Sequence, residues 1–337
     1  MWMGVGNRFA RPQAGGGLGN RAPSLDFSFL SSTVDPRLTY SRASVATDGI
    51  YTDTTGSSYN SFSSGVPRIS PANGLWIEGF ATNYLLNSTA PATQTTGSLG
   101  INPYVLWVIG TGSAAVSAGT ATITGAGTAT AGNPVFFNVT VAGTVTVTVT
   151  GSLTRFQLEQ NAVPTSFIST AGATAQRQQD SVSISLGSWY NAAAMSFAAE
   201  CKLQYLGSPT QTPILMNIDD GTNANRISMN LGAALHDNAL VSNAGTNTTS
   251  STTNSFSTSQ IIRGSASFSA LGESASLLGG TPSIRTALPA GGIPAGVTTL
   301  RLGVLATGGA ALNGYLRKAT YYPRDLYPAD LQRVSSL

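Results

Sequence analysis

Apolar and polar residues alternate with a period of two along most of this chain, which predicts β-strands. The clearest case is residues 143–151, where valine and threonine alternate between two glycines. Because successive side chains of a strand point to opposite faces, the valines should pack in a core and the threonines should face water or another chain. Apolar runs at 104–109 and 135–141 complete a predicted small antiparallel sandwich of roughly six short strands within residues 100–168.

The segment Thr154–Ile168 ends this predicted sandwich. Phe156 and Leu158 alternate with polar residues, so the pattern predicts a half-buried strand whose second face, with Gln157 and Glu159, is polar. A turn and then a proline follow, and proline cannot occupy a central strand. We therefore expect the chain to leave the small sandwich here.

Residues 181–337 show the same alternation in longer segments and predict a second, larger sandwich. Two apolar runs, 214–218 and 226–231, flank the polar turn 219–225 and predict a hairpin. A short helix should start near Pro328, since proline suits the first helical turn. The predicted fold class is all-β, with two antiparallel β-sandwiches preceded by an N-terminal docking module.

The composition fits this prediction and excludes several functions. Only 9% of the residues are charged, against about 25% in ordinary domains, and the net charge is +3. With lysine only at 202 and 318 and no run of arginines, the chain lacks the clustered positive charge that nucleic acid requires. No stretch is long enough to insert into a membrane as a helix. Residues 1–23 lack the apolar segment of a secretory signal and predict a glycine-rich arm.

Groups suited to catalysis are few. His236 is the single histidine and lies in a polar segment, so we expect a solvated loop residue. The single cysteine, Cys201, alternates with apolar residues and should be buried. Glycoside hydrolysis needs two neighbouring carboxylates, but the glutamates fall in four separate segments, at Glu78, Glu159, Glu200 and Glu273. Glu200 should pair with Lys202 on the surface. We expect no catalytic residue, no metal site and no cofactor.

Several residues are nevertheless suited to binding a ligand. Trp189 and Tyr190 can stack on sugar rings, because aromatic faces suit the apolar faces of sugars. The hairpin turn carries oxygen ligands of the kind that calcium prefers, at Asp219, Asp220, Asn223 and Asn225. We favour the alternative, a turn whose side chains bond its own backbone. This turn and two further stretches, 241–259 and 278–297, are predicted to be long uncharged loops suited to a hydroxyl-rich ligand.

Several separated motifs resemble a module that recurs in virion proteins of tailed bacteriophages. They are DPRLTYSRAS at 35–44, VPR at 66–68, GLWIEGFATNYLLNS at 74–88, and QLE followed by PTSFI within 157–168. An arginine and then an aspartate follow in the connector to the large sandwich. The family usually has an acid and an arginine where this chain has Gly79 and Ala81, so any ion pair made there is absent. Arg37, Arg42 and Arg68 should bond backbone carbonyls or Asp35.

The end of the chain carries a second resemblance. LNGYLRKATYYPRDLYPADLQ at 312–332 and DDGTNANRI at 219–227 are similar to segments of the concanavalin A-like, or laminin-G-like, jelly rolls of phage tail proteins. Together with the patterns above, the resemblance divides the chain into a flexible glycine-rich arm at 1–23, a docking module at 24–99, the small sandwich at 100–168 and a jelly roll at 181–337.

These resemblances imply a structural protein of a phage particle, a fibre or spike component located in the virion. Its N-terminal region would contact other virion proteins, and its jelly roll would bind a host surface polysaccharide. Related fibres are commonly trimers, and the uncharged threonine face also favours a homo-oligomer. Two alternatives stay open. One is a decoration or head-fibre protein that coats or clamps the capsid, and the other is a depolymerase that acts on surface glycan.

Overall fold

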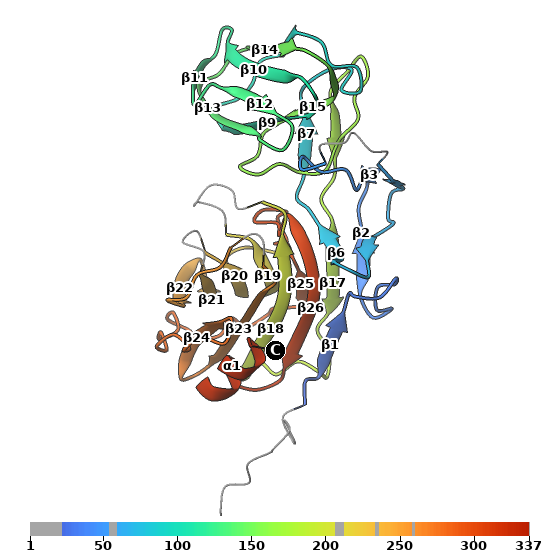
Figure 1. Cartoon of the computed structure of the whole chain (residues 1–337). Coiled ribbons are helices and arrows are strands. Elements are labelled where there is room, and N and C mark those ends of the chain that lie inside the picture. Colours follow the sequence, from blue (N-terminus) through green and yellow to red (C-terminus); the bar gives the residue numbers. More distant parts are fainter. Residues whose placement is uncertain (1–21, 54–58, 206–211, 233–235, 258–259, 337) are drawn as a thin grey trace, which may run out of the picture.

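The computed structural model describes residues 22–53, 59–205, 212–232, 236–257 and 260–336. It confirms the all-β class and the two antiparallel sandwiches. Figure 1 shows a large sandwich, a small sandwich at one end of it, and an N-terminal segment that runs along the side of the large sandwich toward the small one.

The large sandwich consists of two seven-stranded sheets. The first, called the β18 sheet, has the order β24-β23-β18-β26-β6-β5, and β1 also pairs with β26. Its strands are β24 (Gly272–Leu277), β23 (Ile262–Ser269), β18 (Ala194–Leu203), β26 (Gly314–Tyr322), β6 (Gly74–Ile77), β5 (Arg68–Ser70) and β1 (Leu25–Ser28).

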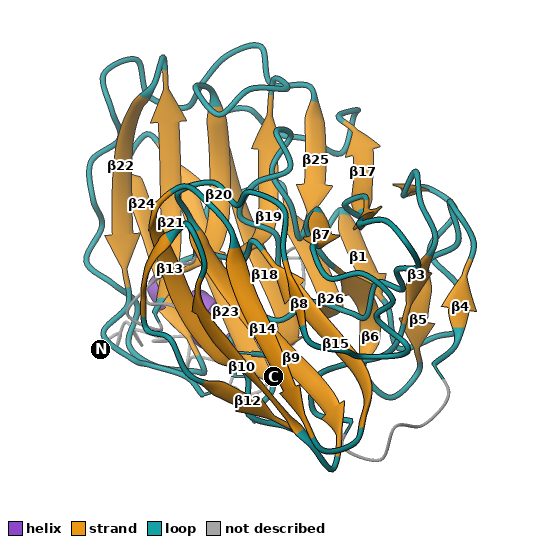
Figure 2. Ribbon diagram, turned by 90° about the horizontal axis from the view of Figure 1, so that it is seen from above, coloured by secondary structure: helices purple, strands orange, loops and turns teal. Residues whose placement is uncertain are grey.

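The second, called the β19 sheet, has the order β2-β17-β25-β19-β20-β21-β22. Figure 2 shows most of its strands side by side in front of the β18 sheet. The strands are β2 (Thr39–Ser41), β17 (Ser181–Ser185), β25 (Thr299–Leu302), β19 (Ile214–Asp219), β20 (Arg226–Leu231), β21 (Asp237–Asn243) and β22 (Thr246–Ser251).

Apolar side chains from the facing sides of the two large sheets form one core. Phe197 and Phe268 of the β18 sheet and Met216 and Ile227 of the β19 sheet are all fully buried in it. Cys201 is buried there as expected, and burial raises the pKa of its thiol. The predicted helix, α1 (Pro328–Val334), packs on the outside of β23 and β24.

The small sandwich consists of two four-stranded sheets, so that it has eight strands where roughly six were expected. Its sheets have the orders β12-β10-β14-β8 and β11-β13-β9-β15. The strands are β8 (Gln94–Thr95), β9 (Pro103–Gly110), β10 (Ser113–Ala118), β11 (Thr122–Thr124), β12 (Thr128–Thr130), β13 (Val135–Val141), β14 (Val145–Thr150) and β15 (Leu153–Glu159). In β14 the side chains of Val145 and Val147 are buried, which confirms the predicted apolar face.

The strands of the segment 24–99 are shared between the two sandwiches. Strands β1, β2, β5 and β6 complete the two large sheets, and β8 lies at the edge of a small one. The remaining strands form two separate ladders, β3 (Ala46–Thr47) with β4 (Ser61–Phe62) and β7 (Ala81–Asn83) with β16 (Ala175–Arg177). Figure 2 shows β3 and β4 beside β5 and β6 at one side of the large sandwich. The arm predicted for residues 1–23 lies, up to residue 21, outside the described residues.

The prediction of a long loop at 241–259 was wrong for its first half. β21 and β22 form a hairpin there, and its turn is Ala244–Gly245, where both residues have positive φ angles, 50° and 81°. Because β22 is an edge strand with a largely exposed face, it tolerates a run of threonine, serine and asparagine that resembles a loop sequence. Residues 278–297 contain no named strand, but an isolated bridge from Thr286 to Glu273 and hydrogen bonds of Ser283 with Ser274 and Ala275 tie them to β24.

Candidate functional site

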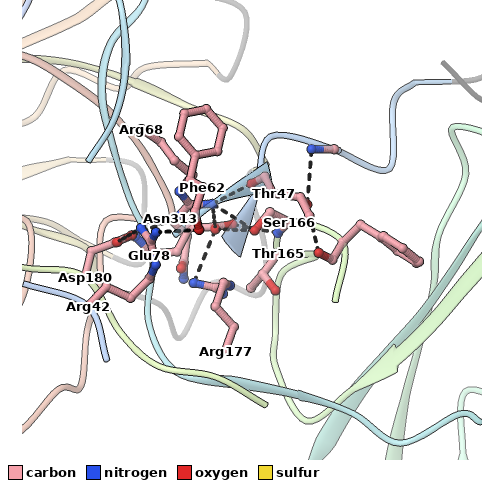
Figure 3. Close-up of polar contacts among 12 residues, drawn as sticks. Arg42, Thr47, Phe62, Arg68, Glu78, Thr165, Ser166, Arg177, Asp180 and Asn313 are labelled. Atoms are coloured by element: carbon pink, nitrogen blue, oxygen red, sulfur yellow. Dashed lines mark hydrogen bonds and ion pairs between the residues drawn. The ribbon is translucent and has the colours of Figure 1, made fainter. Parts of the chain in front are cut away.

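Charged residues from the separate motifs meet between the two sandwiches in one buried group, which we call the junction cluster (Figure 3). All its members are at most 2% exposed. They are Arg42 after β2, Arg68 at the start of β5, Glu78 after β6, Glu159 at the end of β15, Arg177 at the end of β16, and Asp180 before β17. The motifs that carry the phage resemblance thus build a single site.

Asp180 connects two of the arginines. One of its carboxylate oxygens accepts hydrogen bonds from Arg42 Nη1 at 3.0 Å and the Tyr40 hydroxyl at 2.5 Å. The other oxygen accepts from Arg68 Nη2 at 2.7 Å and from the backbone N–H of Glu78 at 2.9 Å. Burial by itself would raise the pKa of Asp180, but the guanidinium groups of Arg68 and Arg177 outweigh it and hold the pKa below its usual range.

Glu78 links the cluster to the segment that leaves the small sandwich. Its carboxylate accepts hydrogen bonds from Arg68 Nη1 at 2.6 Å and from the backbone N–H and hydroxyl of Ser166 at 2.7 and 2.6 Å. Arg177 Nη1 lies 3.3 Å from the same carboxylate. Burial opposes ionisation, but Arg177 and Arg68 together lower the pKa of Glu78, so this group stays a carboxylate.

Glu159 corrects the prediction for β15. Both Gln157 and Glu159 are fully buried, so this strand is covered on both faces and is not half-buried. The Glu159 carboxylate accepts from Trp107 Nε1 and Gln157 Nε2, each at 3.1 Å, and from the backbone N–H and hydroxyl of Thr165 at 2.8 and 2.5 Å. Burial raises the pKa of Glu159, and these four donors oppose that effect.

The arginines fulfil the expected carbonyl contacts only in part. Arg42 donates to the carbonyls of Ser44, Ser63 and Val66 at 2.9, 2.9 and 3.1 Å, and exposed Arg37 pairs with Asp35 at 2.9 Å, as predicted. Arg68 donates to one carbonyl, and its main partners are the two acids.

Arg177 is the least satisfied member of the cluster. Its guanidinium makes no hydrogen bond within the described part of the chain and relies on its ion pair with Glu78. Burial therefore lowers the pKa of Arg177, although an arginine remains a cation at any ordinary pH.

The junction cluster is suited to connecting the two sandwiches rigidly. Its three arginines pair with Asp180 and Glu78, and these acids accept hydrogen bonds from residues far apart in the sequence, as Asp180 does from Arg42. A buried charge with good partners is costly to separate from them. With exposures of at most 2%, these carboxylates offer no open position to a substrate. The arrangement fixes the small sandwich against the large one.

Trp189 and Tyr190 lie in the turn after β17. Their rings make an edge contact with each other, and the Trp189 ring stands against buried Tyr321 with centroids 5.0 Å apart. Both side chains are half-buried and pack on the core of the large sandwich. Ser24 also donates to the Trp189 carbonyl at 3.0 Å. Only part of either ring is therefore accessible to a ligand.

The hairpin turn uses its oxygens internally, as the favoured interpretation predicted. Asp219 is buried and pairs with Arg301 at 3.0 Å, and its carboxylate accepts from the Gly221 N–H at 2.8 Å. Asp220 accepts from the backbone and hydroxyl of Thr222 at 2.9 and 2.6 Å. Asn225 donates to Asp220 at 2.8 Å, and Asn223 donates to Thr307 at 3.2 Å. Within the described ranges, no group of three or more His, Cys, Asp or Glu side chains is arranged to hold a metal ion.

Two other predictions need correction. Glu200 does not pair with Lys202, because its carboxylate accepts from Arg317 at 2.5 Å and from Arg263 at 2.9 Å on the neighbouring strands. His236 is half-buried and not fully solvated, with Nδ1 2.8 Å from the carbonyl of Asn254.

Two acids inside the large sandwich form no ion pair with another residue of the described ranges. Asp237 and Glu273 are fully buried, and their oxygens make no well-formed hydrogen bond in the described structure. Burial raises the pKa of Asp237 well above its usual range. Burial likewise raises the pKa of Glu273 to about 8, against a weaker opposing effect of the Thr248 hydroxyl and the Val241 N–H. Burial thus favours the neutral form of both groups in the folded protein.

Sequence reasoning missed Glu78, Glu159, Arg177 and Asp180 as partners in one site. A usable signal was present, because only 9% of the chain is charged and these four residues lie within or beside the recurrent motifs. In a chain with few charges, a charged residue beside apolar strand residues is more often buried with a partner than exposed to water.

Comparison with known proteins gives only distant matches. No protein-family model matches the chain, and no curated protein matches it. Similar solved structures include the CBM40 module of a Ruminococcus gnavus IT-sialidase, with 13% identity, a TM-score of 0.37, and coverage of 43% of this chain and 84% of that one. Another is the NanB sialidase of Streptococcus pneumoniae, with 16% identity, a TM-score of 0.34, and coverage of 46% and 26%.

A third similar structure is a heptameric SAP-like pentraxin from Limulus polyphemus, with 12% identity, a TM-score of 0.30, and coverage of 44% and 73%. Likenesses of this level concern the β-sandwich architecture alone, and we draw no functional conclusion from them. In the described part of the chain, no helix is long and apolar enough to span a membrane.

Proposed function

We propose that this protein is a structural component of a tailed-phage particle, a fibre or spike subunit that binds a host surface glycan and catalyses no reaction. The observation that carries the proposal is the junction cluster. The motifs that resemble the phage module, separated by up to 138 residues, converge there as Arg42, Arg68, Glu78 and Asp180.

Such a cluster suits a fibre or spike subunit, which must keep its shape when mechanical force acts on it. Its ion pairs hold two sandwiches in one orientation, and the buried carboxylates are saturated by donors and therefore cannot act as a general base. Glycan binding fits the neutral loops of the large sandwich, which carry asparagine, serine and threonine in place of charge. The N-terminal residues would contact other virion proteins.

The test uses the full-length chain, because strands β1, β2, β5 and β6 belong to the large sheets and residues 181–337 alone would leave both sheets incomplete. The chain should bind host cells and their purified surface polysaccharide without shortening the polysaccharide. Gold-labelled antibody on whole particles should mark the tail. Labelling of the head would favour a decoration protein, and release of oligosaccharide would favour a depolymerase.

A further inference from the structure

A cleft of about 360 Å³ lies where the small sandwich meets the large one. One wall is formed by Gly79 and Phe80, which follow β6, together with Gln160 and Asn161, which follow β15. The opposite wall is formed by residues 308–311 and Asn313 before β26 and by Thr212 and Pro213 before β19. This volume falls in the range of small-ligand sites, about 300–1,000 Å³.

The chemistry of the lining is uniform. None of the described residues that line the cleft is charged, although charged groups fill the junction cluster close by in the chain. Three carboxamides, Gln160, Asn161 and Asn313, contribute instead. The Oδ1 atoms of Asn161 and Asn313 already accept from the N–H groups of Ala162 and Gly79, so these two residues offer NH₂ donors to sugar hydroxyls, and Gln160 offers both a donor and an acceptor. A cleft without charge offers no ion pair to an anionic or cationic ligand.

An aromatic ring completes this set. Phe80 is 46% exposed and lines the cleft. An exposed ring next to neutral hydrogen-bonding groups can cover the apolar C–H face of a sugar. Asn313 is held in place because its Oδ1 accepts from the Gly79 N–H at 3.0 Å. Its NH₂ group makes no hydrogen bond with another described residue and stays available to a ligand.

Gly79 keeps the cleft open. A Cβ atom added at this residue would lie 3.1 Å from the Cβ of Ala311 and 3.9 Å from Oδ1 of Asn313. Any longer side chain at position 79 would therefore have to enter the space between the two walls. The absence of a side chain here maintains the cleft volume.

We propose that this cleft binds a neutral saccharide. The inference rests on the proposed glycan-binding function and assigns that binding to the junction of the two sandwiches, beside the loops of the large one. The carboxamides bond the hydroxyls, and the Phe80 ring covers one face of the sugar.

The experiment measures calorimetric binding of the full-length chain to neutral hexaoses of glucose, mannose and galactose, and to a hexaose of galacturonic acid. Gly79→Leu fills the cleft. Its matched control is Gly97→Leu, because a Cβ at residue 97 meets nothing within 4 Å. Phe80→Ser removes the ring without adding bulk, and its control is Ile284→Ser, at a side chain 92% exposed.

At least one neutral hexaose should bind, and Gly79→Leu and Phe80→Ser should each weaken that binding by about tenfold or more. Both controls should bind like the unchanged chain, and melting temperatures should identify any variant that fails to fold. Equal binding by folded Gly79→Leu and Phe80→Ser would place the site elsewhere and overturn the proposal. So would binding of the galacturonic acid hexaose alone.

The two proposals can fail separately. If the chain binds host cells but no neutral hexaose, the cleft proposal fails and glycan binding by the loops of the large sandwich remains. If it binds neither cells nor hexaoses, both fail.

Discussion

Replacing Asp180 with asparagine should destabilise the protein strongly. The amide keeps the size of the carboxyl group but removes the negative charge that faces Arg42 and Arg68, both 2% exposed. Breaking a buried ion pair by removal of one partner costs about 3–5 kcal/mol. Arg68 keeps Glu78 and Arg42 keeps its carbonyl partners, so we expect the lower end, about 3 kcal/mol.

Thermal unfolding followed by circular dichroism at pH 7 measures this effect. With an unfolding entropy of about 2.1 cal/mol/K per residue, each kcal/mol shifts the melting temperature of this 337-residue chain by roughly 1.4 °C, so Asp180→Asn should melt roughly 4 °C lower. Asp35→Asn is the matched control, because its pair with Arg37 has side chains 26% and 50% exposed. Such a pair is worth about 0–1 kcal/mol. Equal melting temperatures for the two variants would refute the idea that the junction cluster holds the sandwiches together.

Three further predictions concern other parts of the molecule. Because the pKa of Glu273 rises from 4.5 to about 8 on folding, the unfolded chain loses its proton first, and stability should fall as the pH rises from about 4.5 to about 8. Glu273→Gln should flatten this pH dependence and stabilise the protein at pH 8 by roughly 2–4 kcal/mol. The control Glu200→Gln, at a residue paired with Arg317 and Arg263, should not do so. An unchanged pH profile in Glu273→Gln would contradict the assignment. Sedimentation should give a homotrimer, since the outer face of β14 carries threonines and no charge, and a stable monomer at micromolar concentration would count against it. A chain that starts at Ser24 should melt within a few degrees of the full chain. The reason is that the first described strand begins at Leu25 and that the Ser24 N–H already donates to the Tyr321 carbonyl. A much lower melting temperature would show that the preceding residues belong to a core.

Sequence periodicity alone determined several of the local elements. The valine–threonine alternation predicted β14, the two apolar runs about a polar turn predicted β19 and β20, and the proline at 328 predicted α1. These elements depend on side chains two to four residues apart, and that spacing is visible in the chain. The Asx-rich turn could be predicted for the same reason, since Asp220 bonds Thr222 and Asn225 within the turn.

Only the tertiary structure decided what covers each polar face. The alternation in β15 identifies Phe156 and Leu158 as apolar, but it says nothing of Trp107 and Thr165, which close over Glu159 from the other side. The sequence likewise does not reveal that β1 and β6 pair with β26, at the opposite end of the chain.

The junction cluster shows the same limit most clearly. Arg42 and Asp180 are 138 residues apart, and a charge can find its partner across any such distance once the strands have packed. From the sequence alone, each of these charged residues is predicted to lie on the surface. It is buried only because the packing of many apolar strands brings the three arginines together with Asp180 and Glu78, and their ion pairs then offset the loss of contact with water.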